Sequence, residues 1–504
     1  MTPQAAPSIR RYDLDWIRVA AFGLLILYHV GLVYGVYDWH VHSVHTFEWM
    51  REAVLVTNPW RLTLLFLVSG AALRFMTLRR TPREVARARF ARLAPPLLFG
   101  AAVLVPIQSW IEARDKADWP GGLDGYLAWM QREFGWSGLA DGVPVNHLWF
   151  VVYIAAYSAV AILLWRRAGL IDRLGDALER MLRGPRLLVV PILYLVAIRI
   201  ALFPIFGLTN NLPFDWYNHA LSLGAFLFGF AVVGRESIWR GFERWRWVAV
   251  GLAVVALPIM MLQVWHPGGR AFFGVPKAIV YGVDQWAVIA AILGFGSRWL
   301  RDRSSPVLTY LTEATFPLYL AHQTVLVVAV WIIRPARLPA GLEALSLIAA
   351  TFLGSLLIYE IVRRIDPIRP LWGLKPRDGR PWPLDLAAWR GEGARYRRRR
   401  ALPRRFLVFV GPPTVIGHLA AVERALRPLH HPVGVVGEDD DRLPAHVQPG
   451  IVVPPLFGRV DAVADEDDLR GHILLLVLHA CAHDDIGAAL PALAAGRAGD
   501  RHLR

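Results

Sequence analysis

The residues best suited to chemistry lie in the first long apolar run of the chain, residues 14–36. This run contains Asp15, Arg18 and His29. Ionisable side chains are costly inside a membrane, so in an apolar run of this length they mark functional sites by default. An unperturbed imidazole titrates near neutral pH, so His29 could take up or release a proton in such a site.

Arg18 and His29 are expected to share one face of a helix. They are eleven residues apart, so at about 100° per residue they fall within about 20° of each other and roughly 16 Å apart along the axis. Asp15 comes one turn before Arg18 and can pair with it. An interfacial arginine and a hydrogen-bonded structural histidine would look the same, but the shared face and the flanking pair favour a functional role.

The elements that must position these residues are apolar helices. Hydrophobic residues make up 55% of the 504-residue chain and charged residues only 19%, whereas a soluble domain carries about a quarter charged residues. We therefore predict an all-α polytopic membrane protein with about ten transmembrane helices, each from a run of roughly 20 apolar residues. The runs fall at residues 14–36, 53–77, 93–110, 146–165, 187–206, 217–234, 247–265, 278–297, 315–333 and 341–362.

The distribution of basic residues predicts the orientation. The formal net charge is +15, and because the basic residues lie between apolar runs, we expect a membrane surface rather than nucleic acid to attract them. One alternating set of loops holds 21 Arg residues and the other set holds 8 Arg and Lys residues. The richer set is expected in the cytoplasm, with both termini on that side. Cys481 is the only cysteine, which excludes an intrachain disulfide and a multi-cysteine metal site, and no metal is predicted.

The composition changes after the predicted membrane domain, residues 1–365. Residues 366–403 are rich in Pro, Trp and Arg and predict a basic linker on the anionic inner leaflet. Residues 404–504 alternate strand-like and helix-like segments, which predicts a small cytoplasmic α/β domain. This tail resembles part of the Rossmann-like front domain of bacterial polyprenyl glycosylphosphotransferases. However, Gly411-Pro412-Pro413 replaces the phosphate-cradling Gly-x-Gly, so a module that docks a cytoplasmic protein partner, or a vestigial module, is favoured over nucleotide binding.

Five short motifs, in the expected order over residues 10–365, resemble acyltransferase family 3, the polytopic bacterial membrane acyltransferases. The family signature is an Arg and a His separated by ten residues, which Arg18 and His29 match. The Asp-Trp-x-Arg form of residues 15–18 looks most like the glucan-biosynthesis branch, whose members succinylate periplasmic glucans. The other matching motifs are Phe66-Leu67-Val68-Ser69-Gly70, Arg89-Phe90-Ala91-Arg92, His147-Leu148-Trp149-Phe150 and Phe316-Pro317-Leu318-Tyr319-Leu320-Ala321-His322.

The resemblance implies transfer of an acetyl, succinyl or similar group from cytosolic acyl-CoA to a hydroxyl of a cell-envelope carbohydrate at the bacterial inner membrane. Acyl-CoA would be a substrate, with no tightly bound cofactor. His29 would be the catalytic base, and Arg18 and Asp15 would hold the first helix in register or bind the donor. Arg89 and Arg92, with Ser69, would bind the donor, although ordinary positive-inside charge explains the two arginines as well.

The resemblance also implies that His147, Trp149, Tyr319 and His322 bind the acceptor. An aromatic residue of the membrane interface explains Trp149 equally well. Tyr319 and His322 are three residues apart, so they share a helix face and could simply form hydrogen bonds across the bundle. No role is assigned to the remaining polar residues of the apolar runs, which are Arg61, Arg199, His219, Asp284, Glu313 and Glu360.

Two other classes of protein fit some of these features. A secondary transporter could use the intramembrane charges to bind a substrate or protons, but such proteins more often show paired inverted halves. The sequence has no such symmetry. A membrane anchor that only scaffolds the tail would leave Arg18 and His29 unexplained.

Overall fold

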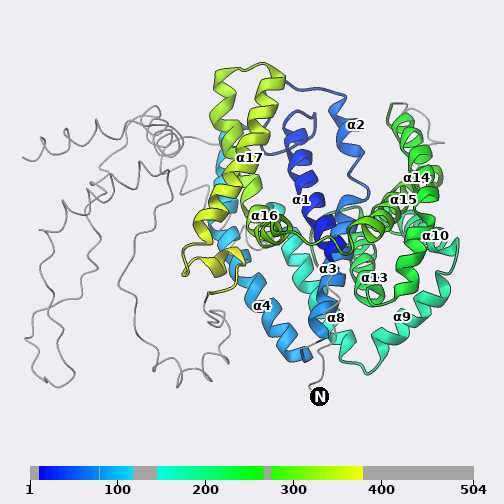
Figure 1. The fold of residues 1–504 in the computed structure, drawn as a ribbon. Coiled ribbons are helices and arrows are strands. Elements are labelled where there is room, and N and C mark those ends of the chain that lie inside the picture. Colours follow the sequence, from blue (N-terminus) through cyan, green and yellow to red (C-terminus); the bar gives the residue numbers. More distant parts are fainter. Residues whose placement is uncertain (1–10, 79, 117–144, 266–273, 378–504) are drawn as a thin grey trace, which may run out of the picture. The chain divides into compact units, whose positions relative to one another are not determined.

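The protein is described by a computed structural model covering residues 11–78, 80–116, 145–265 and 274–377, which form helices and no strands in these ranges (Figure 1). The predicted domain of residues 404–504 and most of the predicted linker lie outside the described residues. The helices are α1 (Tyr12–Val33), α2 (Met50–Leu55), α3 (Arg61–Thr77), α4 (Pro82–Phe99), η1 (Gly100–Leu104), α5 (Val105–Asp115), η2 (Asn146–Leu148), α8 (Trp149–Trp165), α9 (Leu170–Met181), α10 (Arg186–Ala201), α11 (Phe203–Phe206), α12 (Trp216–Asn218), η3 (His219–Leu223), α13 (Gly224–Val232), α14 (Glu236–Trp265), α15 (Val275–Leu300), α16 (Pro306–Ile333), η5 (Arg334–Ala336), α17 (Ala340–Val362) and η6 (Arg369–Trp372).

Eight helical stretches in the described ranges are long and apolar enough to cross a membrane, which confirms a helical multi-pass membrane protein. The two other predicted segments are also helical but shorter. Helix α3 has 17 residues, and the run predicted at 217–234 is divided among α12, η3 and α13. The eight stretches are Tyr12–Val33, Pro82–Asp115, Asn146–Trp165, Arg186–Phe206, Glu236–Gln263, Val275–Leu300, Pro306–Ala336 and Ala340–Val362.

The two shorter helices, α3 and α13, pack against each other with their backbones in close approach. A Cβ atom built on Gly70 would lie 1.9 Å from the main-chain oxygen of Phe226, and one built on Gly229 would lie 2.0 Å from that of Leu67. Only glycine fits at either position, since the nearest neighbours are backbone atoms that cannot move aside. Small residues at a helix contact allow this close packing in a membrane. Gly70 of the predicted Ser-Gly motif is therefore a packing residue.

Helix α4 begins earlier than the apolar run that predicted it. The Thr81 hydroxyl accepts a hydrogen bond from the Glu84 amide, the Glu84 carboxylate accepts one from the Thr81 amide at 2.7 Å, and Pro82 occupies the first turn. This capping box starts the helix at Pro82, before the apolar run that begins at residue 93. Arg89 and Arg92 therefore lie on a helix, ahead of the apolar run predicted at residues 93–110.

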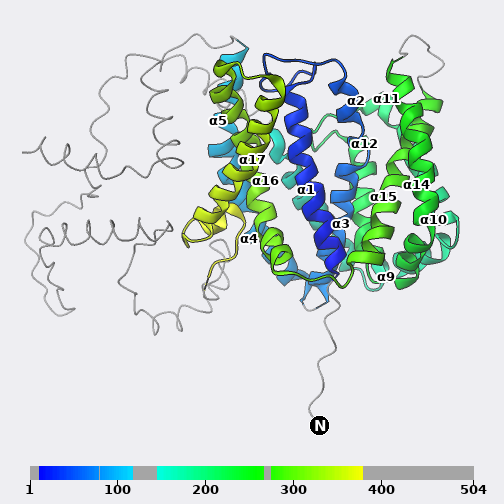
Figure 2. The same cartoon turned by 45° about the horizontal axis from the view of Figure 1, so that its top comes forward.

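Helix α1 is in contact with α3, α15, α16 and α17 (Figures 1 and 2). Its first turn is held by a buried ion pair in which Arg11 donates two hydrogen bonds to Asp13, at 2.9 and 2.5 Å. The Arg11 guanidinium also lies 3.9 Å from the centre of the Trp239 ring on α14. A bidentate pair with a cation–π contact fixes the register of α1 against its neighbours.

The first part of the predicted linker packs on the bundle. Helix η6 contacts α4 and α16, and the buried Trp372 ring lies 5.4 Å from the Phe99 ring. Arg369 is also buried and donates a hydrogen bond to the Lys375 carbonyl at 2.8 Å. The described residues 366–377 are therefore joined to the helical bundle.

Candidate active site

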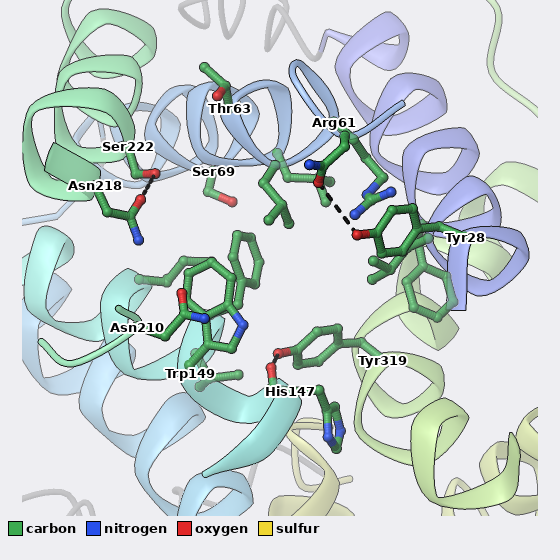
Figure 3. A pocket seen from close by; sticks show the side chains of 18 of the residues that line it. Tyr28, Arg61, Thr63, Ser69, His147, Trp149, Asn210, Asn218, Ser222 and Tyr319 are labelled. Carbon is green, nitrogen blue, oxygen red and sulfur yellow. Dashed lines mark hydrogen bonds between the residues drawn. The ribbon is translucent and has the colours of Figure 1, made fainter. Parts of the chain in front are cut away.

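A cavity of about 880 Å³ lies inside the bundle, bounded by α1, α3, α4, α8, α10, α15 and α16 among others (Figure 3). Eight of the ten predicted site residues line it. No Asp or Glu is among its described lining residues, but five of these residues are arginines: Arg18, Arg61, Arg89, Arg92 and Arg199. A cavity wall with this charge favours an anionic ligand.

His29 on α1 is paired with His322 on α16. Nδ1 of His29 lies 3.2 Å from Nε2 of His322, and Nδ1 of His322 lies 2.6 Å from the main-chain oxygen of Tyr319. A carbonyl oxygen can only accept, so Nδ1 of His322 carries the proton and its neutral Nε2 accepts from Nδ1–H of His29. Nε2 of neutral His29 then has a free lone pair, as a general base requires.

His147, which the sequence predicted to bind the carbohydrate acceptor, makes hydrogen bonds at both ring nitrogens. Nε2 donates to the Leu320 carbonyl at 3.2 Å, and Nδ1 accepts from the Gln108 amide at 3.3 Å. The Tyr319 hydroxyl donates to the His147 carbonyl (Figure 3). His147 and Tyr319 thus hold η2, which directly precedes α8, and α16 together next to His322. In the described ranges no group of three or more His, Cys, Asp or Glu side chains is placed to hold a metal ion.

Three arginines meet at another part of the cavity wall. Arg18 from α1 and Arg89 and Arg92 from α4 all line it. Nε and Nη2 of Arg89 are buried without a hydrogen-bond partner in the described part of the chain, and the Arg92 guanidinium lies 6.0 Å from the centre of the Phe316 ring. Among the described residues no carboxylate is within ion-pair distance of Arg89 or Arg92, so this region offers unsatisfied donors to an anion.

Two of the ten predicted site residues, Asp15 and His322, lie behind the cavity wall. Asp15 accepts a hydrogen bond from Arg18 at 3.1 Å, as the spacing predicted, and holds that guanidinium from behind. His322 is completely buried and reaches the cavity through His29. Ser69 and Trp149 both line the cavity, on opposite sides in Figure 3.

Sequence reasoning missed a polar network beneath the histidines. Gln108 is completely buried and donates to Thr324 at 2.7 Å, while its carbonyl accepts from Gln323 at 3.1 Å. Gln323 also donates to Nε2 of His40 at 2.8 Å, and Nδ1 of His40 contacts Glu112. These residues are far apart in the sequence and share no motif. The occurrence of Gln108, Gln323 and Thr324 within apolar runs was the only available signal, and His40 and Glu112 lie outside these runs.

A second missed group lies across the cavity from Tyr28 and Tyr319 (Figure 3). Asn210, Asn218 and Ser222 line the wall there, and Ser222 donates to Asn218 at 2.6 Å. Asn218 in turn donates to the buried Asp215 at 2.9 Å. Ser222 is on the π-helical turn η3, a feature that is frequent at functional sites. The spacing of 218 and 222 was the only sequence signal.

Residues 11–360 match the model of a family described as an acyltransferase domain. The match covers more than half of the chain, and the chain therefore belongs to this family, as the motifs predicted. It is an acyltransferase that transfers groups other than aminoacyl groups, and the secondary-transporter alternative is not retained.

The chain is similar to proteins named glucans biosynthesis protein C, in agreement with the branch that the Asp-Trp-x-Arg motif indicated. It is 23% identical over 400 residues to the protein of Shigella dysenteriae serotype 1 (strain Sd197) and to that of Escherichia coli (strain K12). Each alignment covers 73% of this chain and 96% of the relative. No solved structure matches this chain.

Proposed function

We propose that this membrane acyltransferase moves an acyl group from acyl-CoA to a hydroxyl of a cell-envelope carbohydrate. The observation that carries the proposal is the chain from His29 through His322 to the Tyr319 carbonyl, which faces the same cavity as three arginines. The carbohydrate acceptor is supported by the similarity to glucans biosynthesis protein C.

His29 supplies the proton transfer that the reaction needs. Its Nε2 takes the proton of the acceptor hydroxyl while that oxygen attacks the thioester carbonyl and forms the new C–O bond. When the C–S bond breaks, the thiolate takes the proton from His29, so no proton is gained or lost overall. His322 and the Tyr319 carbonyl keep the lone pair of His29 directed at the cavity and stabilise its protonated form.

The arginines bind the donor. Arg18 and His29 are about 16 Å apart along α1, so an anionic group at Arg18, Arg89 and Arg92 is separated from the reacting carbonyl by a long arm. Coenzyme A has this form, since its phosphates and its thiol lie at opposite ends of the molecule. Arginine forms bidentate hydrogen bonds with phosphate oxygens, and these bonds are stronger when water is excluded.

The arginine end of the cavity faces the cytoplasm in this proposal, and both chain termini lie on the same side. The uneven distribution of basic residues between the two sets of loops supports this orientation in the inner membrane. Acyl-CoA would then enter from the cytosol, and the acceptor would meet His29 near the far end of α1.

Transfer by purified protein tests the proposal. The protein in lipid vesicles is supplied with radiolabelled acyl-CoA and a glucose oligosaccharide, and the labelled ester is separated and counted. We expect ester formation and stoichiometric release of free thiol. Absence of both with a panel of short acyl-CoA donors would contradict the proposed donor and acceptor.

A further inference from the structure

Arg61 is a cation of the cavity wall that the proposed reaction does not use. It is the first residue of α3, its side chain is only 2% exposed, and it lines the cavity. Its guanidinium lies 3.6 Å from the centre of the Tyr28 ring, beside which Figure 3 shows it. Tyr28 directly precedes His29, so Arg61 lies at the level of the reacting group.

The hydrogen bonds of Arg61 leave part of its donor capacity unused. Nη1 donates to the Thr57 hydroxyl at 3.1 Å, but Nε is buried without a partner in the described part of the chain. Within the described ranges no carboxylate is close enough to form an ion pair with Arg61. Burying a charge without a partner of opposite charge is unfavourable, and a bound anion would remove most of this cost.

The anion that Arg61 requires is separate from the group bound by the other arginines. Tyr28 and Arg18 are ten residues apart on α1, or about 15 Å along its axis. One phosphate group therefore cannot contact both Arg18 and Arg61, which lies beside Tyr28. Arg61 therefore lies beside His29, whereas Arg18, Arg89 and Arg92 lie far from it, and no acidic side chain is among the described residues that line the cavity. The fifth arginine of the wall, Arg199, donates a hydrogen bond to the Tyr217 hydroxyl at 3.1 Å.

We propose that Arg61 is a specificity-determining residue that binds a carboxylate of the substrate next to the carbonyl that reacts at His29. This inference rests on the proposed function. The carboxylate comes either from the distal end of a dicarboxylic acyl chain on the donor or from an acidic sugar of the acceptor. Tyr28 holds the Arg61 guanidinium against its ring, which orients the remaining donors toward the ligand.

The test compares substrates that differ only in the carboxylate. Succinyl-CoA and butyryl-CoA have the same chain length, but a methyl group replaces the distal carboxylate in butyryl-CoA. Glucose and glucuronate oligosaccharides form the corresponding acceptor pair. Binding and KM are measured for the wild type, Arg61→Gln and Arg61→Lys, with the exposed Arg173→Gln on α9 as a matched loss of charge.

For a dicarboxylic acyl chain, we expect Arg61→Gln to weaken succinyl-CoA binding by about tenfold or more and to leave butyryl-CoA binding unchanged, because a hydrogen bond between charged groups is lost. For an acidic acceptor, the same loss is expected with glucuronate oligosaccharides alone. Arg61→Lys should retain part of the preference, and Arg173→Gln all of it.

Equal effects of Arg61→Gln on charged and neutral substrates, or no effect, would overturn the inference. So would a wild type that binds both members of each pair equally well, an outcome that needs no variant to fold. Binding is measured without turnover, so absence of ester formation alone would contradict the proposed function and leave this test decisive.

Discussion

The arginines and the histidines near α1 differ in how many of their side-chain nitrogens have a hydrogen-bond partner. At the arginine end, Nε and Nη2 of Arg89 have no hydrogen-bond partner among the described residues. At the histidine end, both ring nitrogens of His147 and of His322 are engaged. A binding region can leave donors open for its ligand, whereas a region that moves a proton must fix each tautomer beforehand.

The largest effect is expected from the histidine end. His29→Ala removes the general base, so we expect kcat to fall by about 10²–10⁴-fold. The KM for acyl-CoA should change little, because the arginines are unaltered. His42→Ala, which removes an imidazole that does not line the cavity, is the matched control. Acyl transfer at the wild-type rate by His29→Ala would exclude this residue from the mechanism.

The arginine end should respond in the opposite way. We expect Arg89→Gln with Arg92→Gln to raise the Kd of acyl-CoA by about 10- to 100-fold, since hydrogen bonds between charged groups are lost. At saturating donor, kcat should be nearly unchanged. Arg83→Gln changes an exposed arginine of the same helix and serves as the control. Unchanged affinity for acyl-CoA would show that Arg89 and Arg92 do not bind the donor and only contribute to the positive charge of the cytoplasmic side.

His322 tests whether the tautomer of His29 matters. His322→Phe removes the acceptor for Nδ1–H of His29, and we expect kcat to fall by about 10- to 100-fold, as for other residues that orient a functional histidine. His322→Gln can still accept this hydrogen bond through its carbonyl and should retain more activity. Equal activity of the two variants would show that His322 only fills space.

The smallest effect is expected from the tail. All five motifs end before residue 325, and the family match ends at residue 360. We therefore expect truncation at residue 402 to leave kcat and the donor KM within about twofold of the wild type. The assay is acyl transfer in membranes, with expression and insertion measured in parallel. Loss of transfer by a well-inserted truncated protein would make the tail a donor-delivery domain.

Sequence reasoning predicted the helical bundle well because the membrane imposes a simple rule on spanning segments. Each backbone polar group must be satisfied within its helix, so long apolar runs report spans directly. The start of α4 was misplaced because a capping box, not hydrophobicity, begins that helix at Pro82. The division of residues 217–234 into three short elements has no counterpart in hydropathy.

The sequence by itself determined the class of protein, the family and the pairing of Arg18 with His29 on one helix face, since these depend on local periodicity and short motifs. Only the tertiary structure decided that His322 lies behind His29 rather than at the cavity surface, and that Arg61 lies beside Tyr28 without an acidic partner in the described ranges. His29 and His322 are 293 residues apart. Such contacts depend on how helices pack against one another, and helix packing is decided by shape and small residues such as Gly70 and Gly229, which no local pattern encodes.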